Sequence, residues 1–172
     1  DGHTLRIAAG GFAQPSDDGG VALACRVAQL VESTDRVVEL FAGSGTLSVA
    51  IAARVNQLVA IEHSAPAAAA LRANLAARGL PARVVTANAD ETRIPKSTTA
   101  VVLDPPRAGA REAIRHVVEA RPRRVVYVSC HPAALARDLA DLSEAGYGID
   151  QLDVFDLFPQ TSHFETVARM VR

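Results

Sequence analysis

One cysteine stands where an open sheet would display a nucleophile. Cys130 directly follows a β-branched run, 124–129, and precedes His131 and Pro132. A polar residue before proline fits a helix N-cap and first helical position, which would set the sulfur near the positive end of a helix. That dipole contributes about 0.3–1 kcal/mol, less than the roughly 1.4 kcal/mol of one pKa unit, yet a few per cent of thiolate suffices for so strong a nucleophile. Covalent catalysis by Cys130 is the functional interpretation, and a small buried thiol is the alternative.

A second candidate lies near the end of the chain. His163 and Glu165 stand at alternate positions where a polar turn, 156–163, enters a final strand. A strand period of two puts both side chains on one face. They are either polar residues of an edge strand, or a general base, Glu165, supported by His163. The spacing alone leaves both interpretations open.

A glycine turn follows the first predicted strand. Gly43 and Gly45 join that strand to a helix, but Ser48 stands where a dinucleotide fingerprint would have its third glycine. Nineteen residues after Gly43, Glu62 ends the next strand, where a carboxylate can accept hydrogen bonds from both hydroxyls of a ribose. The two features together favour a nucleoside cofactor over a generic turn with a surface glutamate.

Two further strand ends carry polar side chains. Asn88 follows the third strand, where it would either read an adenine edge or close an Asx turn. Asp104 follows the fourth, and two prolines make its turn rigid. Enzymes that methylate exocyclic amines place an aromatic residue after such prolines, whereas Arg107 stands here. Amine methylation is therefore an alternative, and Arg107 is either a phosphate ligand or a surface charge.

Predicted strands and predicted helices alternate along the chain. Strands are predicted over 36–41, 57–61, 83–86, 99–103 and 124–129, and helices over 20–32, 46–54, 65–78, 110–120 and 133–145. Gly79 and Gly146 fit helix C-caps. Such alternation predicts an α/β fold with a mostly parallel sheet and helices on both faces. The runs 149–155 and 164–171 have no helix between them and predict an antiparallel pair.

Composition limits the class of protein. The 172 residues have a net charge of −1 and 49% hydrophobic composition, which fits one domain with a real core and gives no global attraction to nucleic acid. The two cysteines form neither a disulfide framework nor a metal-spaced set, so we expect a cytoplasmic domain without a metal. Cys25 lies in a helical run and is expected to be a buried structural thiol. No apolar run approaches the length of a membrane span.

Four motifs together resemble one enzyme family. Residues 39–46 (ELFAGSGT), 103–110 (LDPPRAGA), 127–138 (YVSCHPAALARD) and 156–165 (DLFPQTSHFE) resemble the catalytic domain of S-adenosylmethionine-dependent RNA (uracil-5)-methyltransferases, which act on tRNA and rRNA. The resemblance runs from about Phe12 to the end of the chain. The cysteine and glutamate motifs are specific to that family, whereas most methyltransferases share the glycine turn.

The resemblance implies a Rossmann-like methyltransferase fold with seven strands, the last one antiparallel. It implies that Cys130 is the nucleophile and Glu165 the base, that the product is S-adenosylhomocysteine, and that Gln14, Phe41, Glu62, Asn88 and Asp104 join the glycine turn in cofactor binding. Many members have asparagine where His131 stands. We expect a lead-in segment, 1–19, a catalytic domain, 20–172, and RNA-binding domains outside this chain. Cytosine C5 methylation, methylation of amines or small molecules, and a non-catalytic cofactor-binding role remain as alternatives.

Overall fold

The computed structural model describes residues 4–11, 16–157, 160–161 and 164–172. Its strands are β1 (Arg36–Leu40), β2 (Gln57–Glu62), β3 (Arg83–Thr86), β4 (Ala100–Leu103), β5 (Arg124–Ser129), β6 (Gly148–Phe155) and β7 (Glu165–Val171). Its helices are α1 (Asp17–Gln29), α2 (Thr46–Ala52), α3 (Ala65–Ala77), α4 (Arg111–Ala120) and α5 (Pro132–Glu144), with a short 3₁₀ turn, η1 (Ala89–Glu91).

The strands form one sheet in the order β3-β2-β1-β4-β5-β7-β6. The five strands β1 to β5 are parallel, and β7 lies antiparallel between β5 and β6. The strand order reverses between β1 and β4, and ligands of open α/β sheets bind beyond the carboxyl ends of the strands at such a point. The start of antiparallel β7 lies at that same edge of the sheet.

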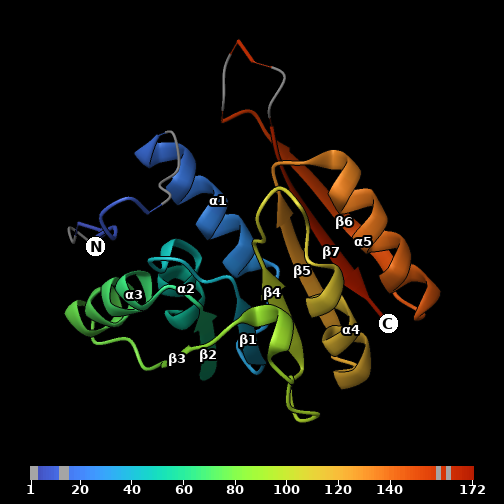
Figure 1. Cartoon of the computed structure of the whole chain (residues 1–172), viewed down its shortest axis with the longest axis horizontal. Coiled ribbons are helices and arrows are strands. Elements are labelled where there is room, and N and C mark those ends of the chain that lie inside the picture. Colours follow the sequence, from blue (N-terminus) through green and yellow to red (C-terminus); the bar gives the residue numbers. More distant parts are fainter. Residues whose placement is uncertain (1–3, 12–15, 158–159, 162–163) are drawn as a thin grey trace.

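Helices cover both faces of the sheet (Figure 1). Side chains of α1, α2 and α3 pack on one face, against Val102, Val126 and Val128 among others. Side chains of α4 and α5 pack on the other, against their strand neighbours Val101, Val125 and Tyr127. This alternation along β4 and β5 is the period of two expected for strands buried on both faces.

The predicted fold is confirmed, including the antiparallel pair at the end. Glycines follow α3 and α5 in left-handed conformation, Gly79 at φ +63° and Gly146 at φ +93°, as their sequence positions predict. The first helix begins at Asp17, earlier than predicted, because Ser16 caps it by accepting a hydrogen bond from the Gly19 N–H.

The expectation for Cys25 was wrong. Its side chain is exposed, because α1 buries the stripe formed by Leu23, Ala24, Val27 and Ala28, and Cys25 lies outside that stripe. Within the described residues, no helix is long and apolar enough to cross a membrane.

Candidate active site

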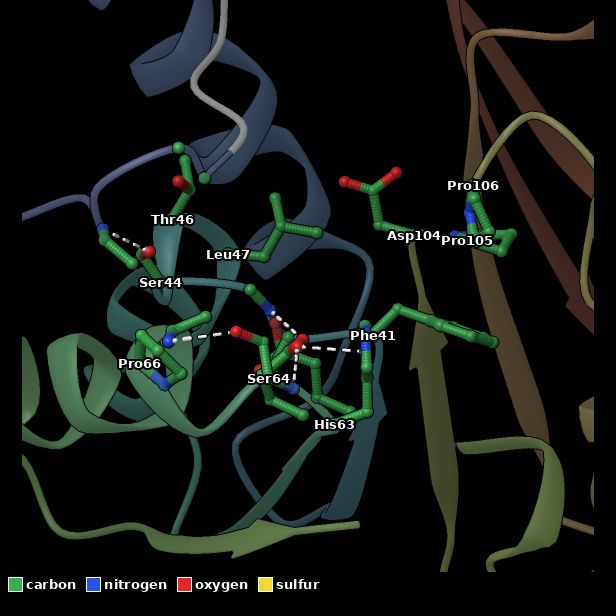
Figure 2. Close-up of a pocket in the computed structure, with 18 of the residues that line it drawn as sticks. Phe41, Ser44, Thr46, Leu47, His63, Ser64, Pro66, Asp104, Pro105 and Pro106 are labelled. Atoms are coloured by element: carbon green, nitrogen blue, oxygen red, sulfur yellow. Dashed lines mark hydrogen bonds and ion pairs between the residues drawn. The ribbon is translucent and has the colours of Figure 1, made fainter. Parts of the chain in front are cut away.

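A cavity of about 720 Å³ opens at the carboxyl ends of the strands. It is within the size range of small-molecule and cofactor sites. Residues from the ends of β1, β2, β4 and β5 line it, together with Glu165 at the start of β7. Figure 2 shows Thr46 and Leu47 of α2 on one side, and Asp104, Pro105 and Pro106 of the loop after β4 on the other.

The glycine turn lies along this cavity. Gly43, at φ +57°, has open space where a Cβ would stand, so its backbone can be approached closely by a ligand. Gly45, at φ +98°, serves packing instead, because a Cβ there would overlap the Leu71 side chain of α3. Phe41 adopts φ +61°, an unusual conformation for a bulky residue and one that clusters at functional sites. Both glycines are predicted from the sequence to bind the cofactor. Of the two, only Gly43 lines the cavity.

Glu62 ties the glycine turn to the end of β2. One carboxylate oxygen accepts the Gly43 N–H at 2.8 Å, and the other accepts the Ser64 N–H at 2.8 Å. Figure 2 draws this junction with His63 and Ser64 beside the turn. His63 Nδ1 also lies 3.2 Å from Oε1, whereas Oε2 contacts only the Gly43 N–H among the described residues. The second lone pair of Oε2 therefore gives the buried Glu62 side chain acceptor capacity toward the cavity that it lines.

A strap formed by residues 6–11 runs past the cavity, and its residues 8–11 line it. The amide of the buried Asn74 on α3 accepts the Arg6 N–H and donates to the Arg6 carbonyl, both at 2.8 Å, and also donates to the Ser44 carbonyl. The Ala8 N–H donates to the Ser44 hydroxyl at 3.2 Å. These bonds place Ala8, Ala9, Gly10 and Gly11 along the cavity. The strap was missed from the sequence because its contacts use backbone groups, which carry no side-chain signature.

Cys130 and Glu165 come together through strand register. The last antiparallel pair of β5 and β7 is Ser129 with Thr166. Cys130 follows Ser129 and Glu165 precedes Thr166, so the register brings both residues just beyond this last pair, at one edge of the sheet. Both residues line the cavity. Spacing alone could not reveal this proximity, because the two residues lie 35 positions apart in the sequence.

The electrostatics of the pair differ from those of an isolated cysteine. His131 is the N-cap of α5, accepting the Ala134 N–H, and Pro132 begins the helix, as predicted. Burial nevertheless raises the pKa of the Cys130 thiol, and the charge of Glu165 adds to that effect, while the Arg107 guanidinium hydrogen-bonds the thiol and opposes it. The helix dipole therefore does not make Cys130 a stable thiolate, and Arg107 contributes more to the site than a surface charge.

Burial also raises the pKa of three carboxyl groups that line the cavity. It raises the pKa of Glu165 to about 7, and that of Asp104 to about 7 with a further contribution from Glu165. It raises the pKa of Glu39 to about 8, where Ser48 opposes the shift and Asp104 adds to it. Among the described residues, Glu39 Oε2 is buried without a hydrogen-bond partner. Glu39 is not among the site residues predicted from the sequence. An acidic residue inside an apolar strand was the feature that could have indicated it.

Of the remaining candidates, Asn88 lies outside the cavity lining. The Asn88 side chain caps η1 by accepting the Asp90 N–H and donates to Glu91, the Asx-turn arrangement, and Asn88 does not line the cavity. Gln14 and His163 lie outside the described residues. Within the part of the chain that the structure describes, no three His, Cys, Asp or Glu side chains form a group that could hold a metal ion.

Two family models match the chain. Residues 96–172 match the model described as tRNA (Uracil-5-)-methyltransferase, which includes Asp104, Cys130 and Glu165. Residues 3–123 match the model described as Methyltransferase small domain, which includes the strap and the glycine turn.

Individual relatives agree with these models. The chain is 39% identical over 148 residues to the 23S rRNA (uracil(1939)-C(5))-methyltransferase RlmD of Photobacterium angustum, covering 83% of this chain and 67% of that one. It is 41% identical over 140 residues to RlmD of Pseudomonas aeruginosa, covering 78% of this chain and 31% of the relative.

One solved structure combines sequence and fold similarity. The tRNA (uracil-54, C5)-methyltransferase of Pyrococcus abyssi, solved in complex with S-adenosyl-L-homocysteine, superposes with a TM-score of 0.85 at 30% identity. The match covers 93% of this chain and 40% of that one. This chain therefore spans less than half the length of that enzyme and of the Pseudomonas relative.

Proposed function

The chain belongs to the RNA (uracil-5)-methyltransferase family, and we propose that it transfers a methyl group from S-adenosylmethionine to carbon 5 of a uridine in tRNA or rRNA. The observation that carries the proposal is that Cys130 and Glu165 line one cavity, just beyond the last register pair of β5 and β7. An unstacked base is needed to reach Cys130, so RNA loops are the favoured substrates.

The cavity suits S-adenosylmethionine, whose role is to supply the methyl group. Glu62 is placed to accept the ribose hydroxyls, and Gly43 lets the ligand approach the backbone of the turn. Phe41 and Asp104 line the same cavity. The carboxyl groups of the buried Glu39 and the half-buried Asp104 favour a ligand with positive charge, because a cation relieves the cost of ionising them. A part for Gln14 and Asn88 in cofactor binding stays a prediction, although Asn88 does not line the cavity, and Gly45 is proposed to act by shaping the turn.

Cys130 makes carbon 5 of uracil reactive. That carbon is too weak a nucleophile to take a methyl group directly from a sulfonium. The Cys130 thiolate adds to carbon 6, which forms a carbon–sulfur bond and an enolate. Carbon 5 of the enolate then takes the methyl group as the methyl–sulfonium bond breaks, and S-adenosylhomocysteine leaves. Covalent addition thereby divides one high barrier into smaller ones. Arg107 supports this step because its guanidinium favours the thiolate over the thiol.

Glu165 completes the reaction. The methylated adduct still holds the original hydrogen on carbon 5. The Glu165 carboxylate takes this proton, the carbon 5–carbon 6 double bond re-forms, and the electron pair of the carbon–sulfur bond returns to Cys130. A base with a pKa of about 7 is well matched to proton transfer near neutral pH. Amine methylation or a purely binding role would leave the Cys130 and Glu165 pair without a chemical task.

The test compares variants of the two residues with uridine-containing and cytidine-containing RNA loops. We expect Glu165→Gln to accumulate a covalent RNA adduct after methyl transfer, because the carbon 5 proton cannot leave, and Cys130→Ala to form neither adduct nor product. Denaturing gel electrophoresis and mass spectrometry of the RNA measure both. Cys25→Ser, which replaces the exposed cysteine, is the matched control and should behave as the wild type. Equal amounts of adduct in Cys130→Ala and Glu165→Gln would refute the mechanism. Methylation of the cytidine-containing RNA alone would show that the substrate base is cytosine and not uracil.

A further inference from the structure

A fully buried carboxylate lies behind the site. Asp138 of α5 has no exposed surface, and its Oδ2 accepts the Tyr127 hydroxyl at 2.6 Å and the Ala110 N–H at 2.7 Å. Its Oδ1 accepts the Nε and Nη2 of Arg137, at 2.8 and 2.7 Å. Burying a charge is costly unless it is paired and hydrogen-bonded, so this set of bonds is what makes the arrangement tolerable. None of these four residues lines the cavity. They act on it through the loop that they hold in place.

The bonds of Asp138 hold one end of the loop 104–110. Ala110 donates its N–H to Asp138, and the Ala108 carbonyl accepts Arg137 Nη2 at 2.9 Å. Gly109 lies between them at φ +85°, and a Cβ there would overlap Arg137 Nη2 and lie 2.7 Å from Asp138 Oδ2. Three consecutive loop residues are therefore fitted closely to the Asp138–Arg137 pair.

The other end of the loop carries the groups that face Cys130. Asp104 follows β4 directly, Pro105 and Pro106 restrict the backbone after it, and Arg107 hydrogen-bonds the Cys130 thiol. Tyr127 also comes from β5, the strand that ends next to Cys130. Burial raises the pKa of the Tyr127 hydroxyl further above its usual value, so it remains a donor to Asp138.

We infer that Asp138 is a positioning residue of the active site: through Tyr127, Ala110 and Arg137 it fixes the loop 104–110 against β5 and α5, and this holds Arg107 at the sulfur of Cys130. The inference rests on the proposed role of Cys130 and deepens it. It assigns the buried Asp138 and its half-exposed partner Arg137 a task beyond stability, since the pair sets the local charge at the nucleophile from behind the cavity wall.

The thiol itself provides a readout that needs neither RNA nor cofactor. The groups around Cys130 are Glu165 of β7 and Asp104 and Arg107 of the loop, with His131 next to it in sequence. Among them, Arg107 favours the thiolate, whereas Glu165 and Asp104 oppose it. If the loop loosens, the thiolate loses the contribution of Arg107, and the alkylation rate of Cys130 falls at any pH below the thiol pKa.

The experiment measures the rate of iodoacetamide alkylation of Cys130 against pH, in a Cys25→Ser background. Tyr127→Phe removes one bond to Asp138, and Tyr147→Phe is the matched control, since the Tyr147 hydroxyl donates to the Pro122 carbonyl away from the cavity. We expect Tyr127→Phe to lower the rate at pH 7.5 roughly threefold, which a rise of half a pKa unit produces, and Tyr147→Phe to leave it unchanged. Asp138→Asn, if it folds by circular dichroism, should lower the rate further.

The Arg107→Ala variant tests whether Tyr127→Phe changes the alkylation rate of Cys130 through Arg107. This variant alone should lower the alkylation rate, and adding Tyr127→Phe to it should cause no further change, because the positioned group is already absent. An unchanged pH profile in folded Tyr127→Phe would overturn the inference. So would an equal shift in Tyr147→Phe, or full additivity in the double variant. Because no RNA or methyl donor is present, these results do not depend on whether the chain methylates RNA.

Discussion

At the scale of single residues, the site combines one thiol with several buried acids. Cys130 could be predicted as a nucleophile from its place between a strand and a proline-initiated helix. Its raised pKa could not, because that shift comes from burial and from Glu165, which the register of β5 and β7 brings to the same end of the sheet. Glu39 was missed for the same reason: only the folded chain reveals that its carboxyl is buried and faces the cavity.

The raised pKa of Glu39 makes the stability of the folded chain depend on pH. Its pKa rises from 4.5 in a free side chain to about 8 in the folded chain, mainly through burial. The folded state therefore binds the proton more tightly than the unfolded state. The stability that this provides is complete below pH 4.5 and is lost as pH rises toward about 8.

Replacing Glu39 by glutamine should remove this loss. We expect the unfolding free energy of Glu39→Gln, relative to the wild type, to increase between pH 5 and pH 8.5 by on the order of a few kcal/mol. Urea unfolding at the two pH values measures it. The exposed Glu112, which pairs with Arg115 on α4, supplies the control Glu112→Gln. A difference between variant and wild type that is the same at both pH values would contradict the burial of an ionisable Glu39.

At the scale of elements, the strands and helices follow their sequence patterns closely, and the loops do not. The glycine turn illustrates the limit. The pattern identified both glycines, but Gly45 serves the packing of Leu71 of α3, a contact between segments that the sequence does not place together. Cys25 shows the same limit on α1, where the choice of buried stripe depends on how the helix sits against the sheet. Asn88 proved to cap η1.

The strap gives a prediction about cofactor affinity. Asn74→Ala removes the amide that holds the Arg6 backbone and the Ser44 carbonyl, so residues 8–11 should leave the cavity wall. Loss of buried hydrogen bonds of this kind costs about 1–3 kcal/mol, and we expect S-adenosylmethionine to bind roughly tenfold more weakly or worse. Isothermal titration calorimetry measures the affinity.

Arg6→Ala is the control for the strap. Only the backbone of Arg6 bonds to Asn74, so truncating its exposed side chain should leave the affinity within about twofold of the wild type. If Asn74→Ala binds the cofactor as tightly as Arg6→Ala does, the strap does not contribute to the cofactor site.

At the scale of the whole molecule, two apolar clusters share one sheet, and the cavity draws residues from both ends of the chain. Its lining extends from Ala8 in the strap to Glu165 at β7. A ligand bound there contacts segments that a partial unfolding would separate. The chain should therefore respond to its cofactor as one cooperative unit, rather than by local ordering of the glycine turn.

Thermal unfolding tests this. At a free concentration of one hundred times its Kd, S-adenosylmethionine should stabilise the chain by about 2.7 kcal/mol. Far-UV circular dichroism reports all the helices, and the fluorescence of Tyr127 and Tyr147 reports the cluster beneath α4 and α5. Both midpoints should rise together. A rise in only one of them would mean that the two faces of the sheet unfold separately.

The proposed mechanism requires that Cys130 bonds to carbon 6 of a uracil that has received a methyl group. The most direct measurement is mass spectrometry of the chain after incubation with S-adenosylmethionine and a 5-fluorouridine-substituted RNA loop, followed by peptide mapping. Fluorine at carbon 5 cannot leave as a proton does, so the methylated adduct persists. We predict an adduct that carries one added methyl group and maps to Cys130. An adduct at any other residue, or methylated RNA produced by Cys130→Ala, would contradict the account.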